Sequence, residues 1–129
     1  MSVWNKWKYV FTNHCETNET HEDERLRSRY YKATNGQAMK AVKEFLQSSP
    51  HYELLSVSEE RGEFSATTRS GKKAFIVITV ISVRPLETAI DFSVTTDTTF
   101  DFGFSRRVIL DLYEQLDKRL PYIGSGING

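Results

Sequence analysis

The expected fold is decided by residues 73–96, which read KAFIVITVISVRPLETAIDFSVTT. Within Lys73–Arg84, apolar side chains occupy both alternating sets of positions, which is typical of a central strand covered by helices on one side and partly on the other. Pro85 has no amide hydrogen to donate, so the chain turns there. In Glu87–Thr96 apolar and polar residues alternate, which predicts a second strand with one face in the core. The residues expected to point inward are Ile90, Phe92 and Val94.

Three further strands are predicted upstream of this pair. Tyr52–Ser58 and Glu63–Arg69 are separated by the turn at residues 59–62, and residues 70–72 turn the chain into the central strand. Ser28–Ala33 has the character of a short strand that leads into the domain.

Two helices are predicted to accompany the strands. Thr34 and the glutamine three residues later form a capping box, which starts a helix over Asn35–Gln47 that stops before Pro50. Ser105 is expected to cap a second helix that ends at Pro121. The apolar stripe of this second helix consists of Ile109, Leu112, Tyr113, Leu116 and Leu120.

These elements predict an α+β fold with a curved antiparallel sheet of four to five strands, two helices on one face and the order β-α-β-β-β-β-α. The chain of 129 residues is 39% hydrophobic, which suffices for one core. We expect residues 1–27 to form an N-terminal edge strand and an acidic loop, residues 28–123 a single α+β domain, and residues 124–129 a disordered tail.

Composition excludes several classes of function. Lys plus Arg and Asp plus Glu each number 17, so the charge that drives general binding of nucleic acid is missing. The longest apolar run, Ala74–Val83, is far shorter than the roughly 20 residues of a membrane-spanning helix. The single cysteine, Cys15, and the lack of a signal peptide favour a cytoplasmic protein. Since no phosphate loop, dinucleotide fingerprint, G-x-S-x-G elbow or H-E-x-x-H motif occurs, we expect no cofactor.

The segment Thr96–Gly103 and the residues that follow resemble a motif of an uncharacterised bacterial and plastid family. That family is known as the domain of unknown function number fourteen ninety-nine. The residues that match are Asp101, Phe102, Gly103, Arg107 and Ile109, with Asn13 and Cys15 matching an Asn-Cys pair near the family's start. The sequence departs from the family's motif at four threonines, because the family tends to have Ser and Arg there. These are Thr95, Thr96, Thr98 and Thr99. The resemblance, over about Asn13–Leu120, implies a fold but no activity, because the family's own activity is unknown.

A candidate binding site lies around the start of the second helix. Its residues are Arg69, Asp97, Asp101, Arg106 and Arg107, with Arg84 as a further member. The free amides of a helix start and two forked arginines suit a carboxylate or a phosphate. Alternatively, Asp101 ties down the turn and pairs with an arginine, while Gly103 supplies a positive φ angle.

Two other clusters have a simpler structural explanation. His14, Cys15 and His21, with Glu22 and Asp23, could in principle hold a metal ion, but their spacing fits no zinc pattern and favours a solvated acidic loop. Near the N-terminus, four aromatic residues and two lysines suit a partner, a membrane surface or single-stranded nucleic acid. An edge strand packed on its own domain is the favoured alternative. The four aromatic residues are Trp4, Trp7, Tyr9 and Phe11, and the two lysines are Lys6 and Lys8.

The sequence therefore favours a non-catalytic binding or interaction module for a small amphipathic or anionic ligand, or for a protein partner. One alternative is a hydrolase-like enzyme with Asp97 or Asp101 as base, which requires a raised carboxyl pKa. The other is a structural subunit that forms a homodimer through an exposed strand edge.

Overall fold

The computed structural model describes residues 14–18, 21, 23–69, 72–96 and 103–125. Within these residues the chain forms seven strands, two α-helices and one short 3-10 turn. In chain order they are β1 (His14–Glu16), η1 (Glu24–Leu26), β2 (Arg29–Tyr31), α2 (Asn35–Ser48), β3 (Tyr52–Ser58), β4 (Glu63–Thr68), β5 (Ala74–Arg84), β6 (Glu87–Thr96), α3 (Phe104–Asp117) and β7 (Tyr122–Ser125).

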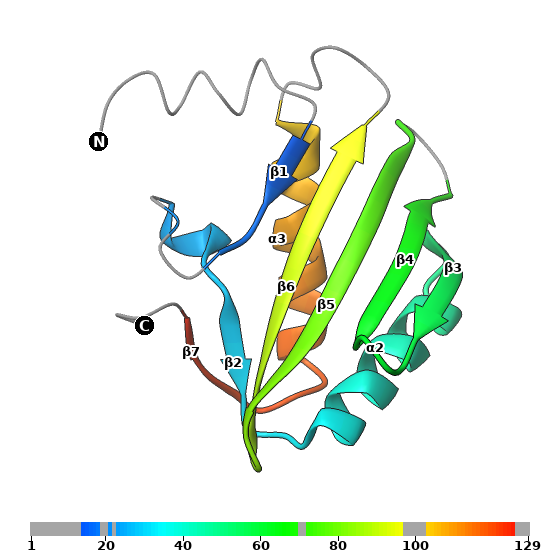
Figure 1. Ribbon diagram of the computed structural model, residues 1–129. Coiled ribbons are helices and arrows are strands. Elements are labelled where there is room, and N and C mark those ends of the chain that lie inside the picture. The colour runs from blue at the N-terminus through cyan, green and yellow to red at the C-terminus, as the bar shows by residue number, and fades with distance from the viewer. Residues whose placement is uncertain (1–13, 19–20, 22, 70–71, 97–102, 126–129) are drawn as a thin grey trace.

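The strands form one antiparallel sheet in the order β3-β4-β5-β6-β2-β7. β6 also pairs with β1, so its outer edge is shared by two short strands. β1 pairs with residues 93–95 of β6, and β2 pairs with residues 88–90. Figure 1 shows both helices behind the sheet, with the other face open toward the viewer. The fold is therefore a two-layer α+β arrangement.

The core lies between the sheet and the two helices. In β5, alternate residues are buried against the helices, while Phe75 and Ile81 on the opposite parity are each 47% exposed. The register Ile78↔Phe92 aligns the inward faces of β5 and β6. The largest fully buried side chains are Tyr31, Tyr113, Phe64, Phe92, Leu26, Leu46, Ile76, Ile78, Ile90, Ile109, Leu112 and Leu116.

The α+β class and the main elements predicted from the sequence are confirmed. α2 begins after Thr34, whose hydroxyl accepts from the Gln37 amide while the Gln37 side chain accepts from the Thr34 amide. β3 and β6 have the predicted bounds, and β4 and β5 differ from the prediction by one residue at one end. These elements have strong local signals: a cap, a turn and an unbroken apolar pattern.

The predicted number of strands, four to five, is wrong, and β1 and β7 extend the predicted order at its two ends. The predicted acidic loop contains β1, and Cys15 and Leu26 are buried in the core. The expected tail over 124–129 starts too early, because β7 pairs with β2 as far as Ser125. Strands of three or four residues are too short to show a hydrophobic period. β1 and β7 each also depend on pairing with a strand that is distant in the sequence.

The second helix starts and ends differently from the prediction. Its N-cap is Gly103, in the left-handed conformation with φ 82°, as the alternative interpretation of that glycine anticipated. Ser105 lies buried in the first turn and is not the cap. α3 ends at Asp117 and not at Pro121, although the whole predicted apolar stripe is buried. Among the described residues, no helix has the length and apolar character needed to cross a bilayer.

Candidate functional site

A hollow of about 220 Å³ lies between the start of α3 and the start of β3. It is lined by His51, Tyr52, Thr68, Phe104, Arg107, Val108 and Asp111. Phe104, Val108 and the ring of Tyr52 supply its apolar surface, and Arg107 and His51 supply its basic groups. We call this the α3 hollow.

One face of α3 supplies four of the seven lining residues. Arg107 and Val108 follow Phe104 by three and four positions and precede Asp111 by four and three, so all four lie on one side of the helix. The exposed guanidinium of Arg107 lies with its central carbon 5.9 Å from the centre of the Phe104 ring. Such an arrangement places a basic group directly over an aromatic surface.

The far wall of the α3 hollow is fixed by a hydrogen bond between two elements. The Tyr52 hydroxyl donates to Oδ2 of Asp111 over 2.6 Å, and this bond joins β3 to α3. Burial raises the pKa of Tyr52, and the hydrogen bond and charge of Asp111 raise it further. Tyr52 therefore remains a protonated donor, and its bond to Asp111 holds the wall in place.

Arg69 lies next to this wall. Its amide donates to the His51 carbonyl over 2.9 Å, and its Nε donates to the Tyr52 carbonyl over 3.0 Å. Of the predicted site residues, Arg107 lines the hollow, and Arg69, 38 positions away in the sequence, bonds to the backbone of two of its lining residues. Both arginines are exposed, but only Arg107 lines the hollow.

The depression continues from the α3 hollow toward the other end of α3. A second hollow of about 290 Å³ shares His51, Tyr52 and Asp111 with it and extends to Arg119. The guanidinium carbon of Arg119 lies 5.5 Å from the centre of the Phe45 ring of α2. Arginine over an aromatic ring therefore recurs at both ends of the depression.

Arg106, a predicted site residue, binds a carboxylate on a different side of the molecule. Its Nε and one terminal nitrogen donate to Oδ2 of Asp23 over 3.0 and 2.7 Å. Burial raises the pKa of Asp23, but the hydrogen bond from Arg106, the amide of Arg25 and the charges of both arginines outweigh it. The pKa of Asp23 consequently lies below its ordinary value. The first-turn arginine is thus paired with Asp23, which belongs to the predicted metal-binding cluster and not to the predicted binding site.

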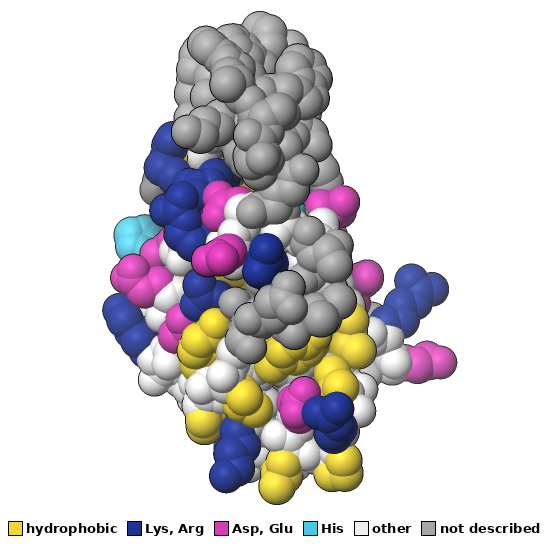
Figure 2. All heavy atoms as spheres, turned by 90° about the vertical axis from the view of Figure 1, so that its left-hand side faces the viewer, with side chains coloured by type: hydrophobic (Ala, Val, Ile, Leu, Met, Phe, Trp, Pro, Cys, Tyr) yellow, Lys and Arg dark blue, Asp and Glu magenta, His cyan; other side chains and the backbone are white. Residues whose placement is uncertain are grey.

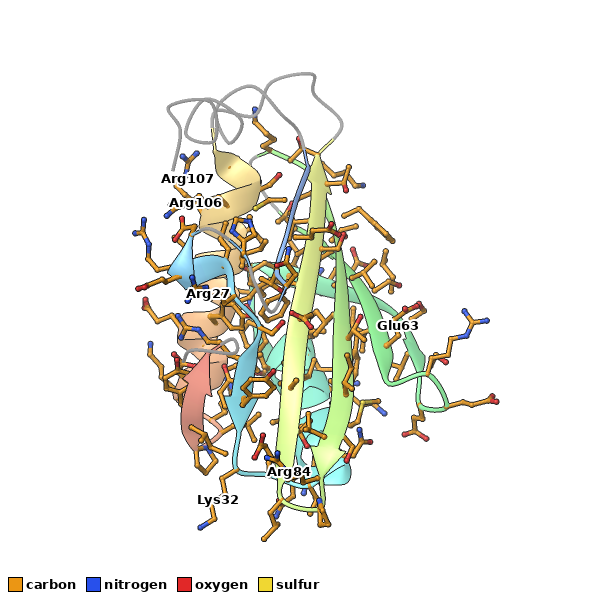
Figure 3. All side chains as sticks on the ribbon, turned by 60° about the vertical axis from the view of Figure 1, so that its left-hand side comes forward. Arg27, Lys32, Glu63, Arg84, Arg106 and Arg107 are labelled. Carbon is orange, nitrogen blue, oxygen red and sulfur yellow. The ribbon has the colours of Figure 1, made fainter. Side chains whose placement is uncertain are left out.

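Other members of the predicted cluster do not join the α3 hollow. Arg84 lies at the β5–β6 hairpin and pairs with Glu87 over 2.8 Å. Figure 3 shows it at the opposite end of the molecule from Arg106 and Arg107. Asp97 and Asp101 lie outside the described residues.

The predicted metal-binding candidates lie in different surroundings. Cys15 is buried in the core. His21 accepts a hydrogen bond at Nδ1 from the Asp23 amide over 3.0 Å, and the Asp23 carboxylate binds Arg106. In the described ranges, no three ligand-type side chains gather in a way that could hold a metal.

Figure 2 shows the side of the molecule that lies on the left in Figure 1. Acidic and basic side chains are intermixed in its upper part, and hydrophobic side chains lie toward the β5–β6 hairpin end.

Most of the lining of the α3 hollow is not among the predicted site residues, including His51, Tyr52, Thr68 and Asp111. The spacing of Phe104, Arg107 and Asp111 opposite the apolar stripe is the one signal that could have indicated a shared helix face. Nothing in the sequence indicates that Tyr52 reaches Asp111, because the two residues are 59 positions apart.

Comparison with known proteins places the fold but no activity. No protein family matches the sequence, and no curated protein is similar to it. The crystal structure of an uncharacterised protein from Bacillus thuringiensis is similar in fold, with a TM-score of 0.52 and 9% sequence identity. The similarity covers 82% of this chain and 92% of that one. At this identity the likeness extends to the fold alone.

Proposed function

We propose that the protein is a non-catalytic, cytoplasmic binding module whose α3 hollow takes a small ligand with an anionic group and an apolar part. The observation that carries the proposal is the placement of Arg107 on the rim of a hollow whose surface includes Phe104 and Tyr52. Arg69 lies next to the hollow, where its Nε donates to the Tyr52 carbonyl. We also propose that the chain is related to the domain of unknown function that its residues around Asp101–Ile109 resemble.

The chemistry of the lining suggests how such a ligand would lie. Its anionic group would meet the guanidinium of Arg107, which offers forked donors to a carboxylate, a sulfonate or a phosphate. Its apolar part would cover Phe104 and Val108. Asp111 would repel an anion placed near it, which favours the Arg107 end for the charged group and makes the site selective for orientation.

The first prediction is that Arg107→Ala weakens binding of naphthalene-2-sulfonate at least about tenfold, since a hydrogen-bonded charge contributes roughly 1.5–3 kcal/mol. An NMR titration of backbone amides measures the affinity and locates the probe. Arg107 is exposed, so the variant is expected to keep the stability of the parent protein.

The matched control is Arg84→Ala, which removes an exposed arginine at the other end of the molecule. It should leave probe binding unchanged. Equal binding by the Arg107 and Arg84 variants would remove Arg107 from the site. Shifts confined to residues away from His51, Tyr52 and α3 would refute the α3 hollow altogether.

The two other functions have less support. Asp97 and Asp101, the candidate bases of a hydrolase, lie outside the described residues, so that alternative has no geometry behind it. A homodimer formed along β3 would meet a β-bulge between Leu54 and Ser56, and bulges disfavour pairing between sheet edges.

A further inference from the structure

A second hollow of different composition lies between the start of α2 and the β3–β4 hairpin, two elements that Figure 1 shows next to each other. Its volume of about 350 Å³ falls within the range of roughly 300–1,000 Å³ that is usual for small-molecule sites. We call it the α2 hollow. It shares no residue with the α3 hollow, and its lining consists of Asn35, Gly36, Met39, Lys40, Lys43, Val57, Glu59 and Phe64.

The floor of the α2 hollow is apolar. Phe64 is buried in the core, and Val57 is its cross-strand partner in the β3–β4 pair. Val57 and Met39 are partly buried and pack against the core. A thioether, a branched aliphatic side chain and an aromatic ring together suit a hydrocarbon group, whose burial there removes apolar surface from water.

Both walls of the α2 hollow are fixed by local bonds. The first turn of α2 is held by the capping box at Thr34. In the hairpin, the Gly62 amide donates to the Glu59 carbonyl over 3.3 Å, and the Gly62 carbonyl accepts from the Val80 amide over 2.7 Å. The hollow is therefore formed before a ligand arrives, which lowers the entropy cost of binding.

Two lysines supply the positive charge of the α2 hollow. Lys40 and Lys43 follow Gly36 by four and seven positions, so they lie on the same helix face as the opening. Both side chains are exposed, and neither forms an ion pair with another described residue. Glu59 is the acid in the lining, so the lining carries one net positive charge. This charge favours a ligand with a single negative charge.

Gly36 is the second observation that points to a ligand. Glycine is less favourable than alanine in a helix, so a helical glycine calls for a reason. Its φ is not positive, and a Cβ at this position would have nothing within 4 Å. Neither the backbone nor the packing of the described residues therefore requires a glycine here. The consequence of its missing side chain is open space at the lining of the α2 hollow.

We infer that the α2 hollow binds a monocarboxylate with an aliphatic chain. The chain covers Phe64, Met39 and Val57, and the carboxylate meets the ammonium groups of Lys40 and Lys43 at the exposed side. Since the two hollows share no residue, this site is independent of the function proposed for the α3 hollow.

An NMR titration of backbone amides with sodium octanoate tests the site. We expect saturable shifts at Gly36, Met39, Val57 and Phe64, and no such shifts with acetate at the same concentrations, because acetate lacks the chain. Gly36→Leu fills the open space and should abolish these shifts. The matched control is Gln47→Leu, which adds the same side chain at an exposed position of α2 outside the lining and should leave octanoate binding unchanged.

The charge of the ligand is tested with 1-octanol, which has the same chain but no carboxylate. The double substitution Lys40→Gln and Lys43→Gln should weaken octanoate binding about fivefold and leave octanol binding unchanged. Both lysines are exposed, so this variant is expected to fold even if Gly36→Leu does not.

Three outcomes would overturn the inference. The first is the absence of saturable shifts at the lining of the α2 hollow. The second is octanoate binding that both the Gly36 variant and the lysine double variant leave unchanged. The third is a set of shifts confined to His51, Tyr52 and α3, which would assign octanoate to the α3 hollow and support the proposed function while removing the α2 hollow as a site.

Discussion

The ion pair between Asp23 and Arg106 explains how a basic residue is accommodated in the first turn of α3. A cation there opposes the helix dipole, so a nearby anion is favourable. Asp23 supplies that anion, and both side chains are only 19% exposed. Asp23 also caps η1 by accepting from the Arg25 amide over 3.0 Å. One carboxylate therefore connects two elements that are about 80 residues apart.

We predict that Asp23→Asn lowers the free energy of unfolding by about 1–2 kcal/mol at pH 7, because asparagine keeps the cap but loses the charge that Arg106 binds. The pKa of Asp23 is lowered in the folded state, so its contribution is present above the ordinary value near 3.9 and is lost as the pH falls through the folded-state pKa. Urea unfolding at several pH values measures the free energy of unfolding of the variant and the parent. The difference between these two free energies should shrink below about pH 4.

A difference that is independent of pH would contradict this account of Asp23. Glu24→Gln, at an exposed position in the same turn, serves as the control and should change stability little.

At the scale of elements, the turn between β3 and β4 depends on Gly62. This residue has φ 67°, and its carbonyl accepts from the Val80 amide over 2.7 Å. A Cβ at this position would collide with the Val80 carbonyl oxygen. The turn is therefore locked against β5 by close backbone contact, which only glycine permits.

We predict that Gly62→Ala lowers the free energy of unfolding by about 2 kcal/mol or more, from the combined left-handed strain and backbone clash. Gly36→Ala is the matched comparison, because a Cβ there has nothing within 4 Å and lies in the first turn of α2. Alanine should stabilise that helix by up to about 1 kcal/mol. Thermal unfolding of the two variants should move in opposite directions; a loss of the same size in both would contradict the argument.

At the scale of the whole molecule, Arg29 connects the β2–β7 edge of the sheet to α3. Its guanidinium pairs with Asp117, and its central carbon lies 4.4 Å from the Tyr113 ring and 5.2 Å from the Tyr122 ring. The Tyr31 hydroxyl donates to the other oxygen of Asp117 over 2.7 Å. Burial and this carboxylate raise the pKa of Tyr31, so the donor stays protonated. The cluster holds the two short strands β2 and β7 and the end of α3 together.

Asp117→Asn is predicted to lower the free energy of unfolding by about 2–3 kcal/mol, because Arg29, only 18% exposed, loses its charged partner. Chemical denaturation measures the change. Glu114→Gln, at an exposed position on the same helix, is the control and should stay within about 0.5 kcal/mol of the parent. A parent-like midpoint for the Asp117 variant would mean that Arg29 is adequately solvated without it.

The amino-acid sequence by itself determined the elements that have local signals. The capping box at Thr34, the turn at Pro85 and the two apolar parities of β5 each act over a few residues, so their outcome can be predicted without knowing the fold. The left-handed Gly103 before α3 belongs to the same group.

Only the tertiary structure decided the rest. β1 and β7 exist because β6 and β2 offer them backbone partners, and Asp23 meets Arg106 because β1 and η1 pack beside α3. The α3 hollow depends on the approach of Tyr52 to Asp111. Each of these contacts joins residues that are distant in the chain, and it forms only because burial of the shared core brings their elements together.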